Sequence, residues 1–135
     1  MIHDYLYLIT PITAIIVSQV LKLATDGIKG NLDVQRIFQT YGGMPSSHAA
    51  FVGSLATIVA LNQDIASPLF GMVFVFGVLV LRDALGLRSI ISRQNQILNR
   101  LSGNKSLPER IYHTPVEIIA GLTLGFAVTL IFLLP

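Results

Sequence analysis

Four long apolar stretches constrain this chain more than any other feature of its sequence. They cover residues 5–24, 46–63, 68–85 and 115–134. A helix that crosses the hydrocarbon core of a bilayer needs roughly 20 predominantly apolar residues. Only 12% of the residues are charged, which is about half the share in a typical soluble domain. The sequence therefore predicts an all-α integral membrane protein with about four transmembrane helices, in a single domain over residues 1–135.

The second stretch is the least certain span, because its apolar part, residues 49–62, is short. It reaches spanning length only if Ser46, Ser47 and His48 form its first turn, or if the bilayer thins there. A three-span chain with a re-entrant second segment is the alternative. Residues 88–101 form a different pattern, in which Ile and Leu alternate with Arg, Gln and Asn. This pattern predicts an amphipathic helix at the membrane interface.

The positive charges lie in alternate connections between the apolar stretches. The first connection and its edge carry Lys22, Lys29 and Arg36. The other six positive residues belong to the third connection and its edge: Arg82, Arg88, Arg93, Arg100, Lys105 and Arg110. With four spans these connections share one side, which the positive-inside rule makes cytoplasmic. We therefore expect both termini outside, and the compact length without a transit-like extension favours a bacterial plasma membrane.

Residues 42–48 form the first concentration of polar chemistry, directly before the second apolar stretch. Pro45 suits the start of a helix, and Ser46 or Ser47 suits its N-cap. The free backbone N–H groups at such a helix start form a site for an anion. His48 stands at the rim of this site and can donate a proton. The structural alternative is that the segment only begins a helix.

Residues 109–117 form the second concentration, before the fourth apolar stretch. Thr114 and Glu117 fit a capping box, with Pro115 at the first helical position. His113 directly precedes this helix. Two helix starts, two histidines and several cations on one side suit a phosphate group, because phosphoryl transfer needs its charge neutralised. A neutral His can attack phosphorus and a second can protonate the leaving oxygen, although Glu117 can also simply complete the cap.

Charged residues beside the third stretch have two interpretations. Arg88, Arg93 and Arg100 suit contacts with anionic lipid headgroups. Asp83 follows Arg82 at a membrane end, where burial of an unpaired acid is costly. An ion pair with Arg82 or Arg88 is the structural interpretation of Asp83, and a Mg²⁺ site is the alternative, without a supporting ligand spacing.

Four blocks of the sequence resemble the divergent branch of the type 2 phosphatidic acid phosphatase superfamily. Members of this branch are often labelled acid phosphatase/vanadium-dependent haloperoxidase-related membrane proteins. The blocks are residues 42–50, 83–88, 95–99 and 109–125. The resemblance runs from about residue 19 to residue 125, and the order and identity of the blocks are specific to the branch. The standard membrane domain of the superfamily has six spans, so four spans imply a reduced core or a dimer.

The resemblance implies a phosphohistidine mechanism. His113 would take the phosphoryl group, Glu117 would orient His113 in place of the superfamily Asp, and His48 would protonate the leaving alcohol. The implied phosphate-binding residues are Lys22, Ser46, Ser47, Arg88 and Arg110. Asp83 and Glu109 are additional candidates for the site.

Several positions depart from the superfamily pattern. Ser47 replaces the glycine of the Pro-Ser-Gly-His motif, and Leu107 stands where an arginine precedes the nucleophile by six residues. Lys22 matches the first motif, whereas Lys29 and Gly30 replace its Arg-Pro pair. A lysine does not fully replace an arginine that binds phosphate through two hydrogen bonds.

We therefore expect a lipid phosphatase that cleaves a phosphomonoester or diphosphate at the cytoplasmic interface. Phosphatidylglycerophosphate, phosphatidic acid and polyprenyl phosphates all fit. The scheme needs no metal or other cofactor, although Asp83 leaves a Mg²⁺-dependent variant open. The expected partners are this lipid, the bilayer and a second copy of the chain, packed through Gly121 and Gly125; no nucleic acid is expected.

Three other functions compete with this expectation. A non-catalytic lipid-phosphate-binding or scaffold protein is the main alternative, and the altered Arg and Gly positions favour it. A transporter subunit is disfavoured because no apolar stretch carries a charge at mid-membrane. A haloperoxidase is least compatible, because the known enzymes of that type are soluble and need a full set of vanadate-binding cations.

Overall fold

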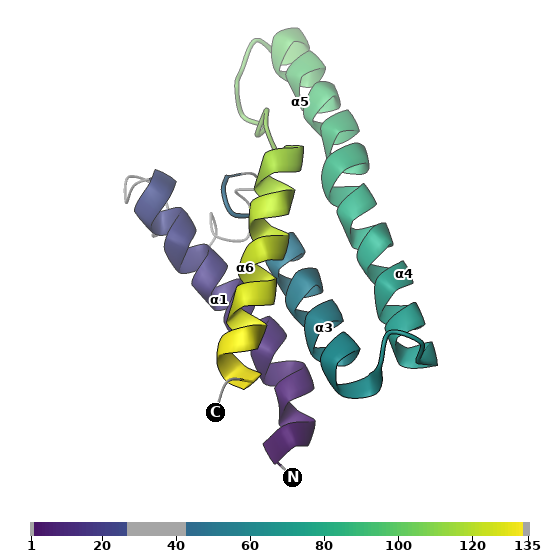
Figure 1. The fold of residues 1–135 in the computed structure, drawn as a ribbon. Coiled ribbons are helices and arrows are strands. Elements are labelled where there is room, and N and C mark those ends of the chain that lie inside the picture. Colours follow the sequence, from purple (N-terminus) through teal and green to yellow (C-terminus); the bar gives the residue numbers. More distant parts are fainter. Residues whose placement is uncertain (1, 27–42, 134–135) are drawn as a thin grey trace.

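The computed structural model describes residues 2–26 and 43–133 of the chain, and the regular structure in these ranges is helical throughout. The elements are α1 (Ile2–Asp26), α3 (Ser47–Gln63), α4 (Pro68–Arg82), the π-helix η1 (Asp83–Leu87), α5 (Arg88–Ser102) and α6 (Pro115–Leu133). Figure 1 shows them as a bundle of long rods. The prediction of an all-α fold is confirmed.

Three helical stretches are long and apolar enough to cross a membrane, namely Tyr5–Ala24, Pro68–Ser102 and Pro115–Leu133. The first and last agree with the predicted spans. Helix α3 has 17 residues, so at 1.5 Å per residue it extends about 25 Å, somewhat less than the roughly 30 Å hydrocarbon core. Ser47 and His48 form its first turn, as the length of the stretch requires.

Helix α3 is the centre of the bundle and packs against α1, α4 and α6 (Figure 1). Its closest approach is to α6, where Gly121 and Gly125 lie directly against its backbone. A Cβ atom on Gly121 would lie 2.7 Å from the Cβ of Ala49, and one on Gly125 would lie 2.6 Å from the amide nitrogen of Ser54. The Gly-xxx-Gly face is therefore used inside the chain. A homodimer stays a prediction. The Gly-xxx-Gly face does not support it, because that face already packs against α3 of the same chain.

Helices α4, η1 and α5 form one continuous rod over Pro68–Ser102 (Figure 1). The predicted span over residues 68–85 corresponds to α4 with most of η1, and the predicted amphipathic helix over residues 88–101 corresponds to α5; the sequence analysis did not predict that they join without a break. The π-helix carries the chain from the apolar to the amphipathic segment without a break. The rod has 35 residues and extends about 50 Å, so α5 reaches beyond the length that a hydrocarbon core covers.

Helix α5 turns polar side chains toward the protein. Ser92 and Asn99 are buried, and they bind the backbone of the segment that precedes α6. The large apolar side chains of this helix are exposed: Ile90, Ile91, Ile97, Leu98 and Leu101. The amphipathic pattern is confirmed, but part of the polar face meets protein backbone instead of water.

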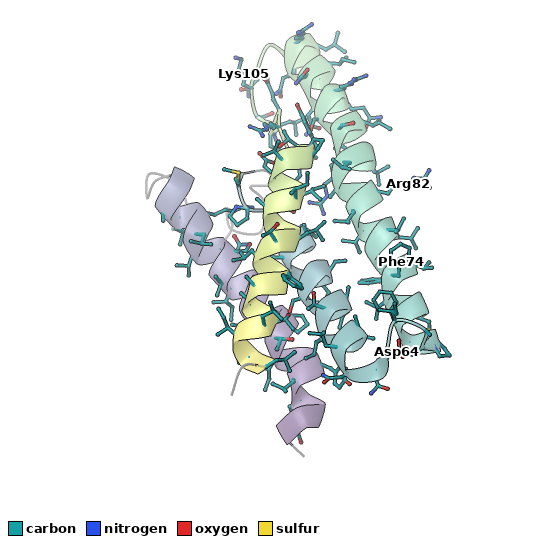
Figure 2. All side chains as sticks on the ribbon, in the orientation of Figure 1. Asp64, Phe74, Arg82 and Lys105 are labelled. Carbon is teal, nitrogen blue, oxygen red and sulfur yellow. The ribbon has the colours of Figure 1, made fainter. Side chains whose placement is uncertain are left out.

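The two ends of the bundle differ in what they carry. Helix α1 begins and α6 ends at one end, whereas α3 and α6 begin toward the other (Figure 1). The turn that contains Asp64 is at the same end as the start of α1, and Lys105 lies at the opposite extreme (Figure 2). Lys29 and Arg36 fall outside the described residues. The helix starts that carry the two histidines therefore share the end where Lys105 lies.

Candidate functional site

His113 is fixed by a carboxylate at the start of α6. Its Nδ1 lies 3.1 Å from Oε2 of Glu117, and its side chain is almost fully buried. The other oxygen of Glu117 accepts a hydrogen bond of 2.6 Å from Nη2 of Arg110. Oε2 also accepts from the backbone N–H of Thr114 at 3.0 Å. With donors on both oxygens, Glu117 acts as an ionised acceptor.

The start of α6 has the geometry of a capping box. Thr114 Oγ1 accepts a hydrogen bond from the backbone N–H of Glu117 at 3.3 Å, and the Glu117 carboxylate accepts one from the backbone N–H of Thr114. Pro115 is the first residue of α6. The predicted cap is therefore present, and the same carboxylate also holds His113. The structural and functional interpretations of Glu117 are thus compatible.

The hydrogen bond to Glu117 determines which nitrogen of His113 is available. A neutral imidazole that donates from Nδ1 keeps a lone pair on Nε2. Burial lowers the pKa of His113 from its ordinary value of about 6.5; the hydrogen bond to Glu117 opposes this shift, and the positive charge of Lys22 adds to it. The imidazole is therefore neutral at pH 7, as a nucleophile requires.

His48 is held by a second chain of contacts. Its Nε2 lies 3.2 Å from Nη2 of Arg88, and Nε of Arg88 donates to Oδ2 of Asp83 at 3.2 Å. Asp83 and Arg88 are five residues apart, and the π-helix between them brings both to the same side of the rod. The predicted Asp83–Arg88 pair is present, and it extends to His48.

The hydrogen bonds around His48 and those around His113 lie next to each other, at the starts of α3 and α6. The ring centroids of His48 and His113 are 6.2 Å apart. The backbone N–H of Ser46 donates to the carbonyl of Glu117 at 3.0 Å, and the N–H of His113 donates to the carbonyl of Ala84 in η1 at 3.1 Å. Helices α3 and α6 and the π-helix are thus joined by backbone bonds directly at the site.

The remaining candidate residues take different places. Ser46 is the N-cap of α3 and accepts from the N–H of Ala49, and Ser47 is the buried first residue of the helix. Lys22, on α1, is close enough for its charge to lower the pKa of His113. Glu109 accepts from Asn99 of α5. The structure thus gathers the candidates at one end of the bundle, with Glu109 directed toward α5.

Leu107 stands where the superfamily has an arginine, and its apolar side chain cannot replace that arginine as a phosphate ligand. Its side chain is exposed, and its backbone N–H and carbonyl are both bonded to the amide of Asn99. Arg110 is the cation of this segment that reaches Glu117. The sequence analysis missed the buried pair Ser92 and Asn99, although the family block at residues 95–99 pointed to this helix.

The carboxylates of this site bind arginines and are not grouped as metal ligands. Within the described part of the chain, no group of three or more His, Cys, Asp or Glu residues could hold a metal ion. The carboxylates of Asp83 and Glu117 each bind an arginine.

Comparisons with known proteins give one family model and one curated relative. The family model described as "Divergent PAP2 family" matches residues 4–128. The chain is 32% identical over 145 aligned residues to a protein of Bacillus subtilis (strain 168), "Uncharacterized membrane protein YuiD", and the match covers 92% of this chain and 91% of that protein. No solved structure matches the chain significantly. The chain is therefore an integral membrane protein that belongs to the divergent PAP2 family.

Proposed function

We propose that the protein is a membrane lipid phosphate phosphatase that acts through a phosphohistidine on His113. The observation that carries the proposal is the pair of histidines 6.2 Å apart, one oriented by a carboxylate and the other beside an arginine. A nucleophile fixed by a third group is the general arrangement of covalent catalysis. Membership of a phosphatase-related family supports the same reaction class.

The chemical steps follow from the roles of the two imidazoles. Nε2 of His113 attacks phosphorus while the bond from phosphorus to the leaving oxygen breaks. Protonated His48 gives its proton to that oxygen, so the lipid alcohol leaves neutral. Water then attacks the phosphohistidine, His48 takes the proton of the water, and inorganic phosphate is released with His113 restored. Glu117 holds the Nδ1 proton of His113 throughout.

Before substrate binds, Nε2 of His48 carries no proton that it could give to a leaving group. An arginine can only donate, so Nε2 of His48 accepts from Arg88, and the imidazole proton sits on Nδ1. This Nδ1 is buried, with no hydrogen-bond partner among the described residues. An anionic phosphate attracts Arg88 more strongly than a neutral imidazole does. Binding of the headgroup would therefore free Nε2 of His48 and favour the protonated form that the general acid needs.

The substrate would approach from the membrane with its tails in lipid and its phosphate at the starts of α3 and α6. Candidate lipids are phosphatidylglycerophosphate, phosphatidic acid and polyprenyl phosphates. Lys22 acts on His113 through its charge, Arg88 contacts His48, and Arg110 contacts Glu117, so these three cations are available to the phosphate. The distribution of positive residues supports a cytoplasmic position for the site, and the Bacillus subtilis relative supports a bacterial plasma membrane.

A non-catalytic lipid-phosphate-binding protein is the second candidate. The observation in its favour is Leu107, which replaces a superfamily arginine and has an exposed side chain. Arg110 is itself engaged with Glu117 and partly exposed. A site with fewer free cations stabilises a transition state less, although it can still bind a headgroup.

The test is phosphate release by the purified protein in liposomes that contain each candidate lipid, with and without Mg²⁺ and vanadate. His113→Ala should abolish release yet retain headgroup binding. His3→Ala removes a histidine from the opposite end of α1 and should leave release unchanged. If no lipid is turned over by a folded wild-type protein, and binding persists, the second candidate function holds.

A further inference from the structure

The polar face of α5 binds a segment that has no regular secondary structure. Asn95 Nδ2 donates to the carbonyl of Pro108 at 2.8 Å, and Gln96 Nε2 donates to the carbonyl of Glu109 at 3.4 Å. Residues 104–114 are neither helix nor strand, so their backbone groups lack the partners that such elements provide. Side chains of α5 supply these partners over successive turns of the helix.

Asn99 makes the most complete of these contacts. Its Oδ1 accepts from the N–H of Leu107 at 3.1 Å, and its Nδ2 donates to the carbonyl of Leu107 at 2.9 Å. The same Nδ2 donates to Oε1 of Glu109 at 3.2 Å. Asn99 is only 4% exposed. A buried amide whose donors and acceptor are all used fixes both the position and the orientation of its partner.

Ser92 makes the corresponding contact closer to the histidines. Its Oγ accepts from the N–H of Ile111 at 3.0 Å and donates to the carbonyl of Arg88 at 2.9 Å. Two residues further along, the N–H of His113 bonds to the carbonyl of Ala84. The segment is thus attached to the rod at residues 107–109, 111 and 113, and Arg110 lies between two attached residues.

We propose that Asn99 and Ser92 are positioning residues, which hold the segment before α6 so that Arg110 and His113 reach Glu117. The proposal rests on the proposed phosphatase function for its effect on rate, but its structural part does not depend on turnover. The hydrogen bonds of Ser92 and Asn99 go to the backbone of Arg88, Leu107 and Ile111 and to the side chain of Glu109, so each residue acts through the segment that it binds. Small displacements of a nucleophile are costly, since about 1 Å can lower a rate about 100-fold.

The test uses Asn99→Ala, with Gln94→Ala as the matched control. Gln94 is an exposed amide on the same helix. We expect Asn99→Ala to lower kcat about ten-fold or more, since the nucleophile is displaced, with a smaller change in KM. Gln94→Ala should match the wild type in both constants.

A second measurement separates positioning from loss of fold. NMR of isotope-labelled histidine in detergent micelles reports the pKa of His113 without any turnover. The groups that influence this pKa are Glu117, Lys22 and Arg88, and the ring of His48 lies nearby. If the segment detaches in Asn99→Ala, His113 gains water, which raises its pKa, and loses the hydrogen bond to Glu117, which lowers it. Burial is the larger of the two causes, so the pKa should rise toward the ordinary value. Gln94→Ala should not change it.

A reversed hydrogen bond provides the rescue. Asn99→Asp keeps the acceptor for the N–H of Leu107, but it loses the donor to the Leu107 carbonyl and faces the Glu109 carboxylate without a donor. Adding Glu109→Gln returns a donor, so the double variant should recover part of the kcat and the lowered pKa of His113. An unchanged His113 pKa in Asn99→Ala, or no recovery in the double variant, would overturn the proposal. Absence of turnover in the wild type would defeat the phosphatase function alone, because the NMR result still decides the positioning role.

Discussion

Glu117 is the residue on which the site depends most. It accepts from His113, Arg110 and the backbone of Thr114, so one carboxylate links the proposed nucleophile, a cation and the helix cap. The capping box and the histidine could be predicted from local spacing in the sequence. That the same oxygen serves both depends on the buried position of His113 against η1, which local spacing does not specify.

Glu117→Gln should lower kcat roughly 100-fold or more, because an amide no longer fixes the Nδ1–H tautomer of the nucleophile. The helix cap is expected to weaken as well, so unfolding is followed alongside kcat. Asp64→Asn is the control, since it removes the same charge in the turn at the other end of the bundle. Equal kcat for Glu117→Gln and the wild type would rule out the orienting role.

The lowered pKa of His113 leads to an expected pH dependence. A nucleophilic imidazole must be deprotonated, so a lowered pKa extends activity toward acid pH. The acid limb of kcat/KM should therefore lie below the ordinary value of about 6.5. In Lys22→Met the limb should move to higher pH, since a positive charge that lowers the pKa is removed. A limb that stays in place in this variant would show that Lys22 does not act on His113.

At the scale of elements, the helices were predictable where a local signal sets their ends. Pro115 with the Thr114–Glu117 box begins α6, and Ser46 caps α3. The continuous rod was not predictable. The polar residues of α5 suggested a helix surface that faces water, whereas in the structure several of them bind backbone groups of residues 107–111. Such contacts depend on a segment that has no periodic pattern of its own.

Close packing of α3 and α6 leads to a prediction about stability. Gly125→Ala places a Cβ atom against Ala50 and Ser54, and overpacking of this kind costs about 1–3 kcal/mol. Gly71→Ala in α4 is the control, since a Cβ there meets nothing within 4 Å and alanine favours the helix by about 1 kcal/mol. Thermal unfolding in detergent should therefore occur at a lower temperature for Gly125→Ala only. Equal destabilisation of both variants would contradict the close approach.

At the scale of the whole molecule, the fold gathers residues that are far apart in the sequence. His48 and His113 come from α3 and the segment before α6, and Arg88 comes from the rod. The family resemblance predicted that the histidines cooperate. It could not predict that Arg88 contacts His48, because that contact depends on the π-helix between Asp83 and Arg88.

The orientation of the bundle can be measured with introduced cysteines, since the chain has none of its own. Ala66→Cys lies in the turn between α3 and α4, and Ser106→Cys lies beyond α5; both positions are exposed. A reagent that cannot cross membranes should label Ala66→Cys in intact cells and Ser106→Cys only after permeabilisation. The reverse labelling would place the site outside and contradict the topology inferred from the positive charges.

The most direct test of the central claim is to trap the phosphorylated enzyme. Radiolabelled lipid phosphate is mixed with the protein in liposomes and quenched rapidly, and the bound label is located by peptide mapping. The account predicts an acid-labile, base-stable phosphohistidine at His113, absent from His113→Ala and present at the same position in Glu117→Gln at a slower rate. Phosphate release with no label on His113, or with label on another residue, would contradict it.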